Sequence, residues 1–222
     1  QREDRRWRIS VDARELSGQA EYEQADARGA SRLKARLARL DLPESAEQDV
    51  TRLLETAPQD LPTLDLVVEA LQLRGKSLGR IEVEAANFEA PGPRLALGRE
   101  WRLNRLNLRV PEAELSSSGR WSPSAGVGAG AVRRTELDFR LDLRDAGALL
   151  ARLGMPDVLR AGSGRLQGRV GWAGTPLALH YPSLNGQLHL DLSRGQFLKA
   201  DAGAAKLLGV LSLQALPRRL LL

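Results

Sequence analysis

Hydrophobic and polar residues alternate along most of this chain, and the alternation is its main structural signal. The clearest case is TELDFRLDLR, in which Leu137, Phe139, Leu141 and Leu143 alternate with charged residues. A period of two places alternate side chains on opposite faces of a strand, so the segment predicts a strand with one apolar face. The same pattern recurs over residues 7–11, 33–37, 64–73, 81–85, 101–110, 164–172 and 185–192.

The alternation changes phase inside two of these predicted strands. In the segment 64–73 the apolar positions shift parity after Val68, and in the segment 101–110 they shift after Leu103. An extra residue in one strand of a pair produces such a shift, so both places predict a bulge or a turn.

Short turns rich in Gly, Pro and Asn separate the predicted strands. Strand follows strand at short spacing, which favours antiparallel meanders over alternating strands and helices. Three segments break the pattern and predict short helices: residues 45–57, which begin with a capping box, residues 144–154, which stop at Gly154 and Pro156, and residues 201–217. The fold class predicted is therefore mainly β with a few short helices.

The domain organisation that these elements predict is one elongated β-rich segment over residues 1–222. It divides into strands over 1–42, a linker with a short helix over 43–60, a β-meander over 61–200 with a short helix near 145–154, and a closing helix over 201–217. Because the sequence begins without Met and stops within a pattern, we expect a piece of a longer protein.

Composition narrows the possible chemistry. The chain has no Cys, which excludes disulfide scaffolds, thiol catalysis and Cys-ligated zinc. Its formal net charge is +5, but the basic residues alternate with acids and do not cluster, which is typical of a solvated surface. A net positive charge also permits attraction to phosphates, in nucleic acid or in lipid headgroups. Four Trp, two Tyr and three Phe are too few and too scattered for a nucleic-acid stacking platform, so no nucleic-acid partner is predicted.

No catalytic constellation stands out. His180 and His189 do not form a metal-binding pair, and no His lies near Ser117 in the predicted strands. The Gly-rich run 126–132 precedes a strand and not a helix, which favours a hairpin loop over a phosphate-binding loop. We therefore predict no enzyme, no metal and no cofactor, with an envelope glycosidase as a minor alternative for which no particular pair of carboxylates is favoured.

The closing segment is apolar from Leu207 to Leu216. Its length of about ten residues is half of the roughly 20 that a membrane-spanning helix needs. As a helix capped by Asp201 it would place Leu207, Leu208 and Leu211 on one stripe. Because little polar surface remains around it, such a helix is either buried in a core or in contact with lipid.

The C-terminal third of the sequence resembles a known family. The stretch from Ser163 to Leu220, and above all the run GQFLK followed by GAAKLLGVLSLQALPRRL, resembles the C-terminal part of the YhdP family, AsmA-like envelope proteins of Gram-negative bacteria that are more distantly related to TamB. The segments beginning WRISVDARELSGQ and LDLVVEALQLRGKSLGRIEVEA are similar more loosely.

The resemblance implies a periplasmic protein whose parent is anchored in the inner membrane by an upstream helix. It implies a long, twisted sheet curled into an open groove with an apolar interior, and a role in moving phospholipid between the inner and outer membranes. The partners it implies are phospholipid, the membrane through the parent's anchor, and possible envelope proteins. The expected groove residues are Leu137, Phe139, Leu141, Leu143, Leu166, Val170, Leu188 and Leu190, with Leu207, Leu208 and Leu211 on the closing helix.

Two other interpretations stay open at this stage. The chain can instead be a structural β-domain of the envelope, with its apolar face sealed by its own helices and used for partner docking. The closing helix can be a plain core helix or a lip that faces lipid at the end of the groove. An open apolar trough would support the lipid-transfer interpretation, and a sealed core would support the structural one.

Overall fold

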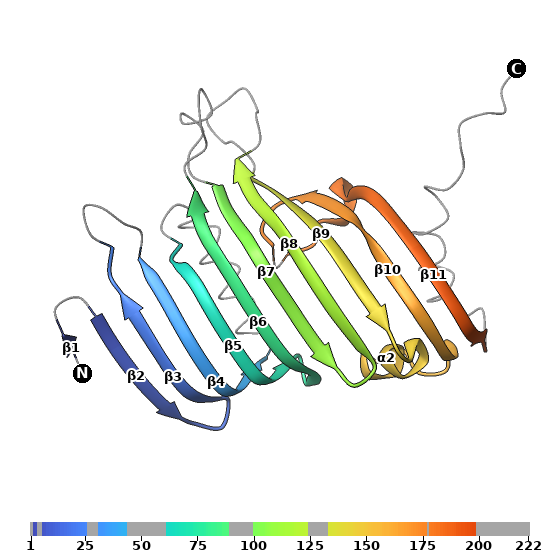
Figure 1. Ribbon diagram of the computed structural model, residues 1–222, viewed down its shortest axis with the longest axis horizontal. Coiled ribbons are helices and arrows are strands. Elements are labelled where there is room, and N and C mark those ends of the chain that lie inside the picture. Colours follow the sequence, from blue (N-terminus) through green and yellow to red (C-terminus); the bar gives the residue numbers. More distant parts are fainter. Residues whose placement is uncertain are drawn as a thin grey trace, which may run out of the picture.

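Over the residues that the structure describes, the fold is a single β-sheet with one α-helix and one 3-10 turn beside it (Figure 1). The computed structural model describes residues 2–3, 6–25, 31–43, 61–88, 100–123, 133–176 and 178–198. Over these residues the elements are β1 (Arg2–Glu3), β2 (Arg6–Asp12), β3 (Leu16–Glu23), β4 (Arg32–Leu42), β5 (Thr63–Leu73), β6 (Lys76–Phe88), β7 (Glu100–Val110), β8 (Ala113–Pro123), β9 (Arg133–Leu143), α2 (Ala146–Arg152), β10 (Leu159–Ala173), η2 (Tyr181–Ser183) and β11 (Asn185–Phe197).

The described part of the chain contributes eleven strands to this sheet, and they lie side by side in the order of the sequence. Figure 1 shows them running from β1 at one edge to β11 at the other. The sheet is open, because no pairing joins β11 back to β1 among the described residues. The predicted fold class, a mainly β protein with a long open sheet, is confirmed.

The orientation of one strand pair differs from the prediction. Strands β4 and β5 are parallel, with Leu33 paired to Leu64 and Leu37 to Val68, so the expectation of antiparallel meanders throughout is wrong here. Parallel neighbours need a connection of about a dozen residues or more. The stretch between Leu42 and Thr63 is long enough, and it contains the segment 45–57 for which we predicted a helix, which lies outside the described residues.

The two predicted phase changes are register shifts in the sheet. The pairing of β5 with β6 shifts between Val68 and Leu71, and the pairing of β7 with β8 shifts between Leu103 and Leu106. Each shift returns the apolar residues to the same face of the sheet after an inserted residue. The apolar pattern is therefore continuous in space although its parity changes in the sequence.

Helix α2 confirms the helix predicted near 145–154. The carboxylate of Asp145 caps its N-terminus by accepting from the Ala148 N–H at 2.9 Å. Gly154, at φ +87°, follows its end. The helix packs closely on β10, because a Cβ on Gly147 would lie 2.3 Å from the carbonyl oxygen of Leu159. It is tethered to the β7–β8 turn by two hydrogen bonds from Arg152 to the carboxylate of Glu112, at 2.8 and 2.6 Å.

The most deeply buried side chains lie on the central strands. Val83, Ala85 and Leu103 form a core cluster on β6 and β7, against which Leu64, Leu66, Ile81, Trp101, Leu106 and Leu137 pack. Val68 on β5 is fully buried. The core is thus one face of the sheet and is centred on the middle of the strand order.

Candidate functional site

One face of the sheet is apolar from β2 to β11. The cross-strand register places apolar residues of neighbouring strands directly opposite one another, so they form ladders that run across the strands. One ladder consists of Val11, Gly18, Leu37, Val68, Ile81, Leu108, Leu115, Leu141, Leu166 and Leu190. The next consists of Ile9, Ala20, Ala35, Leu66, Val83, Leu106, Ser117, Phe139, Gly168 and Leu188. We call the surface formed by these ladders the apolar face.

The eight predicted groove residues all lie on this face. Leu141 of β9 is opposite Leu166 of β10, which is opposite Leu190 of β11. Phe139 and Leu188 flank Gly168 in the next ladder. The remaining three are Leu137, Val170 and Leu143. Leu137 is paired to Val170, and Leu143 is paired to Gly164, on the same face of the sheet. The structure therefore brings together every groove residue that the alternation predicted on β9, β10 and β11.

The expected orientation of β9 is also the observed one. The Arg140 side chain lies on the opposite face, half exposed, and its Nε donates to Asp142 at 2.8 Å. Its cross-strand partner on β10 is Gln167, while Leu166 pairs with Leu141. The strand is thus in the register that the sequence pattern predicts.

Burial along the apolar face changes from the middle of the sheet to its edges. Val68 on β5 has no exposed surface, whereas Leu190 on β11 is 42% exposed and Ile9 on β2 is 48% exposed. All three belong to the two neighbouring ladders described above. The face is therefore covered over the central strands and open to solvent on the strands at both edges.

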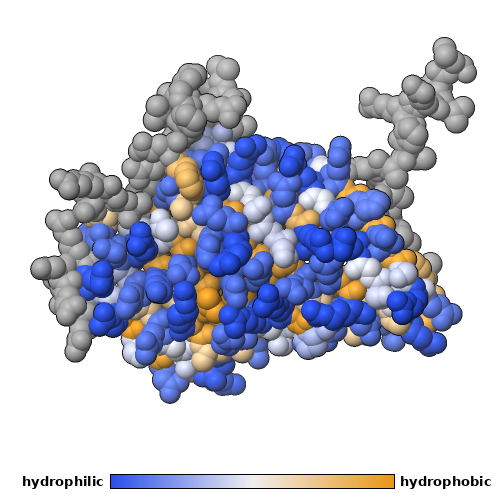
Figure 2. All heavy atoms as spheres, viewed as in Figure 1, coloured by the Kyte–Doolittle hydropathy of each residue, from blue (hydrophilic) through white to orange (hydrophobic). Residues whose placement is uncertain are grey.

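The opposite face carries ladders of ion pairs. Figure 2 shows one side of the molecule on which hydrophilic residues dominate. Cross-strand arginine–carboxylate pairs recur along the sheet: Arg8–Glu21, Arg36–Asp65, Arg105–Glu84, Arg109–Glu114, Arg120–Glu136 and Arg169–Asp138. Exposed pairs of this kind contribute little stability each. Their effect is to give the sheet one water-soluble face.

Asp142 lies at the centre of one such group. It accepts from Arg140 on its own strand and from Arg165 on β10, each at 2.8 Å. Hydrogen bonds from these two guanidinium groups lower the pKa of Asp142 to about 2. The carboxylate therefore stays ionised at any ordinary pH and serves to pair two arginines.

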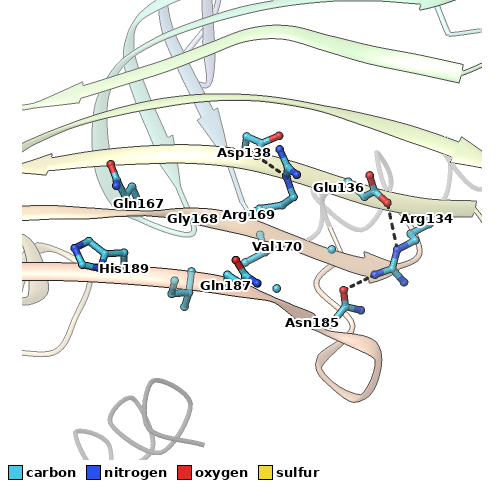
Figure 3. A pocket seen from close by; sticks show the side chains of 13 residues that line it. Arg134, Glu136, Asp138, Gln167, Gly168, Arg169, Val170, Asn185, Gln187 and His189 are labelled. Atoms are coloured by element: carbon cyan, nitrogen blue, oxygen red, sulfur yellow. Dashed lines mark hydrogen bonds and ion pairs between the residues drawn. The ribbon is translucent and has the colours of Figure 1, made fainter. Parts of the chain in front are cut away.

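A hollow of about 880 Å³ lies on this charged face over β9, β10 and β11 (Figure 3). Arg169 donates to Asp138 at 2.7 Å, and Arg134 reaches over β10 to Asn185 on β11 at 2.7 Å. His189 stands opposite Gln167. The described residues that line the hollow include no Ser, Thr or Cys nucleophile, and no three His, Cys, Asp or Glu in the described part of the chain gather as metal ligands. The hollow offers hydrogen bonds but no arrangement for nucleophilic chemistry.

A row of aromatic residues borders the apolar face, and sequence reasoning missed it. Trp101 on β7 is paired to Trp121 on β8, Trp121 to Thr135 on β9, and Thr135 to Trp172 on β10. We call these four residues the Trp row. The available signal was weak: Trp121 and Trp172 both end a segment in which a glycine precedes an alternating strand.

Arg133 lies beside this row, one step further along the same face of β9. Its guanidinium stacks over Trp121, with Cζ 4.2 Å from the ring centroid, and donates from Nη2 to the Trp121 carbonyl oxygen at 2.9 Å. Burial lowers the pKa of Arg133. A guanidinium begins from so high a pKa that it stays charged, and the negative charge of Glu100 partly opposes the effect of burial.

The closing segment falls outside the described residues. This applies to the helix predicted over 201–217 and to Leu207, Leu208 and Leu211. Within the part of the chain that is described, no helix is both long enough and apolar enough to cross a membrane.

Comparison with known proteins yields one family. The model of that family, described as YhdP protein, matches residues 1–222. The chain belongs to the YhdP family. The resemblance noted from GQFLK and GAAKLLGVLSLQALPRRL is thereby confirmed. Neither the curated proteins nor the solved structures include a match to this YhdP protein. Membership is consistent with a cell-envelope protein related to lipid transport.

Proposed function

We propose that this chain is a non-enzymatic segment of a phospholipid-transfer protein that acts between the inner and outer membranes of a Gram-negative envelope. The acyl chains would lie along the apolar face. The single observation that carries the proposal is the continuity of the apolar ladders from β2 to β11. Family membership supports it at the level of an envelope protein related to lipid transport.

The physical argument begins with the cost of exposing apolar side chains to water, about 25 cal/mol for each Å². Leu188 and Leu190 on β11 are 37% and 42% exposed, and Ile9 on β2 is also exposed. The neighbouring exposed leucines at the β11 edge support a binding surface there, because exposed apolar patches usually mark such surfaces. Acyl chains match it because they are apolar along their length and need no hydrogen bonds, which a row of leucines does not supply.

The charged face explains how such a sheet can function in an aqueous compartment. Its arginine–carboxylate pairs keep the outer surface hydrated while the other face contacts lipid. We propose the periplasm as the compartment, with the parent protein held in the inner membrane by a segment upstream of this chain.

A second function is favoured by one specific observation, the burial of the central strands. Val68, Ala85 and Leu103 are almost completely covered, as in a sealed core. In this alternative the chain is a structural β-domain of the envelope that docks a protein partner. The exposed leucines at the β11 edge favour lipid transfer over this alternative.

A pair of variants on β11 tests the proposal. The double change Leu188→Asn with Leu190→Asn makes the exposed end of the apolar face polar, and His189→Asn changes the residue between them, which lies on the charged face. The assay measures transfer of fluorescent phosphatidylethanolamine from donor to acceptor vesicles. We expect the double variant to transfer at least fivefold more slowly and His189→Asn to match the wild type. Absence of transfer by the wild-type chain, or a double variant that transfers at the wild-type rate, would contradict the proposal.

A further inference from the structure

The connection between β10 and β11 carries no charged residue. The turns β2–β3, β5–β6 and β7–β8 each carry at least one, such as Arg14, Arg74 and Glu112. In the sequence the gap is wider still, because no Asp, Glu, Lys or Arg stands between Arg169 and Asp191, although 27% of the whole chain is charged. Charged residues normally occupy exposed positions. A run of this length without them indicates a part of the surface that does not simply face water.

Apolar side chains are exposed at this connection. Residues 178–182, which we call the tip, are five consecutive exposed residues with the sequence ALHYP. Leu179 is 43% exposed and Tyr181 is 73% exposed. The exposure continues into β11, where Leu188 and Leu190 are also exposed. The tip and the exposed end of the apolar face therefore belong to one uncharged stretch of the chain.

Hydrogen bonds order the tip. The Oγ of Ser183 accepts from the Ala173 N–H at 2.8 Å and donates to the His180 carbonyl oxygen at 3.2 Å. The Leu184 N–H donates to the Tyr181 carbonyl oxygen at 3.1 Å, which closes the 3-10 turn, and a proline within the turn fixes one φ angle. The exposed apolar side chains are thus presented by an ordered turn, which lowers the entropy lost when they contact a partner.

The size and the composition of the tip select the kind of partner. A stable protein–protein interface takes about 20–30 residues from each side, whereas the tip offers five. Shallow contact with a bilayer needs only a few apolar side chains and disfavours charged ones, which are costly among acyl chains. Tyr is enriched at the level of the lipid headgroups, because its ring is apolar and its hydroxyl stays in water. Leu179 and Tyr181 in an uncharged turn fit this contact.

We propose that the tip inserts into the surface of a phospholipid bilayer, with Leu179 among the acyl chains and Tyr181 at the headgroups. Leu188 is three residues from the start of β11 at Asn185, about 10 Å along the strand, so the exposed end of the apolar face lies close to that bilayer. β11 is the last strand of the described sheet (Figure 1). The inference rests on the proposed function and adds the place at which lipid passes between the sheet and a membrane.

Site-specific labelling tests the insertion directly, because the chain has no native Cys. The environment-sensitive fluorophore NBD is attached to Ala178→Cys in the tip. Its matched control is Ala13→Cys in the β2–β3 turn, where another exposed Ala stands. With vesicles of phosphatidylethanolamine and phosphatidylglycerol, the fluorescence at position 178 should rise about twofold and be quenched by a lipid with a spin label on its acyl chain. If the label at 178 stays in water, or if both labels enter the bilayer equally, the tip is not the contact.

A double variant separates apolar insertion from charge attraction. Leu179→Ser with Tyr181→Ser removes both exposed apolar side chains and adds no charge. It should bind neutral phosphatidylcholine vesicles about tenfold more weakly than the wild type, and it should keep its Tm because both side chains are exposed. Phe197→Ser removes an exposed aromatic side chain at the other end of β11 and should leave binding unchanged. Equal weakening by Phe197→Ser would contradict a specific role of the tip.

Further outcomes separate this inference from the function on which it rests. The double variant should keep bound phospholipid in native mass spectrometry, while its transfer of phospholipid between vesicles slows. If the wild-type chain neither binds nor transfers phospholipid, the proposed function fails. If the wild type transfers phospholipid and the double variant does so equally fast, only the membrane contact is refuted. A wild-type dimer in sedimentation equilibrium that becomes a monomer in the double variant would assign the tip to a second copy of the chain and overturn the proposal.

Discussion

Stability should fall unequally when equivalent positions of one apolar ladder are made polar. Val68 and Leu190 belong to the same ladder, but Val68 is fully buried and Leu190 is 42% exposed. Val68→Asn loses the burial of a whole side chain, about 1.5–3 kcal/mol, and buries an unpaired amide at a further cost of about 1–3 kcal/mol. Leu190→Asn loses roughly 1 kcal/mol, because the new amide stays in water.

Thermal unfolding followed by circular dichroism measures this difference. For a chain of this size, about 1 kcal/mol shifts Tm by roughly 2–4 °C. Val68→Asn should therefore lower Tm by about 5 °C at the least and by more than about 10 °C at the middle of these ranges, and Leu190→Asn by about 3 °C. His189→Asn, next to Leu190 but on the charged face, should leave Tm unchanged. If Leu190→Asn lowered Tm as much as Val68→Asn does, the apolar face would be sealed over β11 and the reasoning on open edges would be wrong.

Three further predictions follow from the polar contacts. The ion pair of Glu112 and Arg152 has two hydrogen bonds and is less exposed than the other ion pairs of the described residues. A double-mutant cycle of Glu112→Gln and Arg152→Gln, measured by chemical denaturation, should therefore give a coupling free energy of about 1 kcal/mol. Zero coupling would show that this ion pair does not hold α2 in place. In the folded chain the pKa of Asp142 is about 2, below its ordinary value of 3.8, so the stability that this carboxylate contributes is present above about pH 4 and is lost as the pH falls toward 2. The Tm of Asp142→Asn should therefore fall less than the Tm of the wild type over that range. An equal fall in Tm would contradict the pairing. His189→Ala and Ser117→Ala should each leave envelope function intact, and loss of function in a folded variant would point to catalysis.

The sequence was sufficient for the features that depend on neighbouring residues. Alternation in TELDFRLDLR predicted the two faces of β9, and the phase changes after Val68 and Leu103 predicted the register shifts in β5 and β7. The stop at Gly154 and Pro156 predicted the short helix that is α2. In each case the relevant physics, side-chain period or helix capping, acts within a few residues.

Features that depend on which strands pair could not be predicted in this way. The parallel pairing of β4 with β5 joins two strands that are far apart in the sequence, and alternation within each strand does not encode the direction of their pairing. The Trp row requires the register of four strands before Trp101, Trp121 and Trp172 become neighbours. Arg133 carried the same ambiguity, because one residue of slip would place it on the charged face.

The proposed function requires the apolar face of this chain to bind the acyl chains of phospholipids. Native mass spectrometry of the chain, purified without detergent from a Gram-negative host, tests it most directly. We expect adducts with the masses of diacyl phospholipids that are lost in the Leu188→Asn, Leu190→Asn double variant and kept in His189→Asn. A wild-type spectrum that shows the chain alone, also after incubation with phospholipid vesicles, would contradict it.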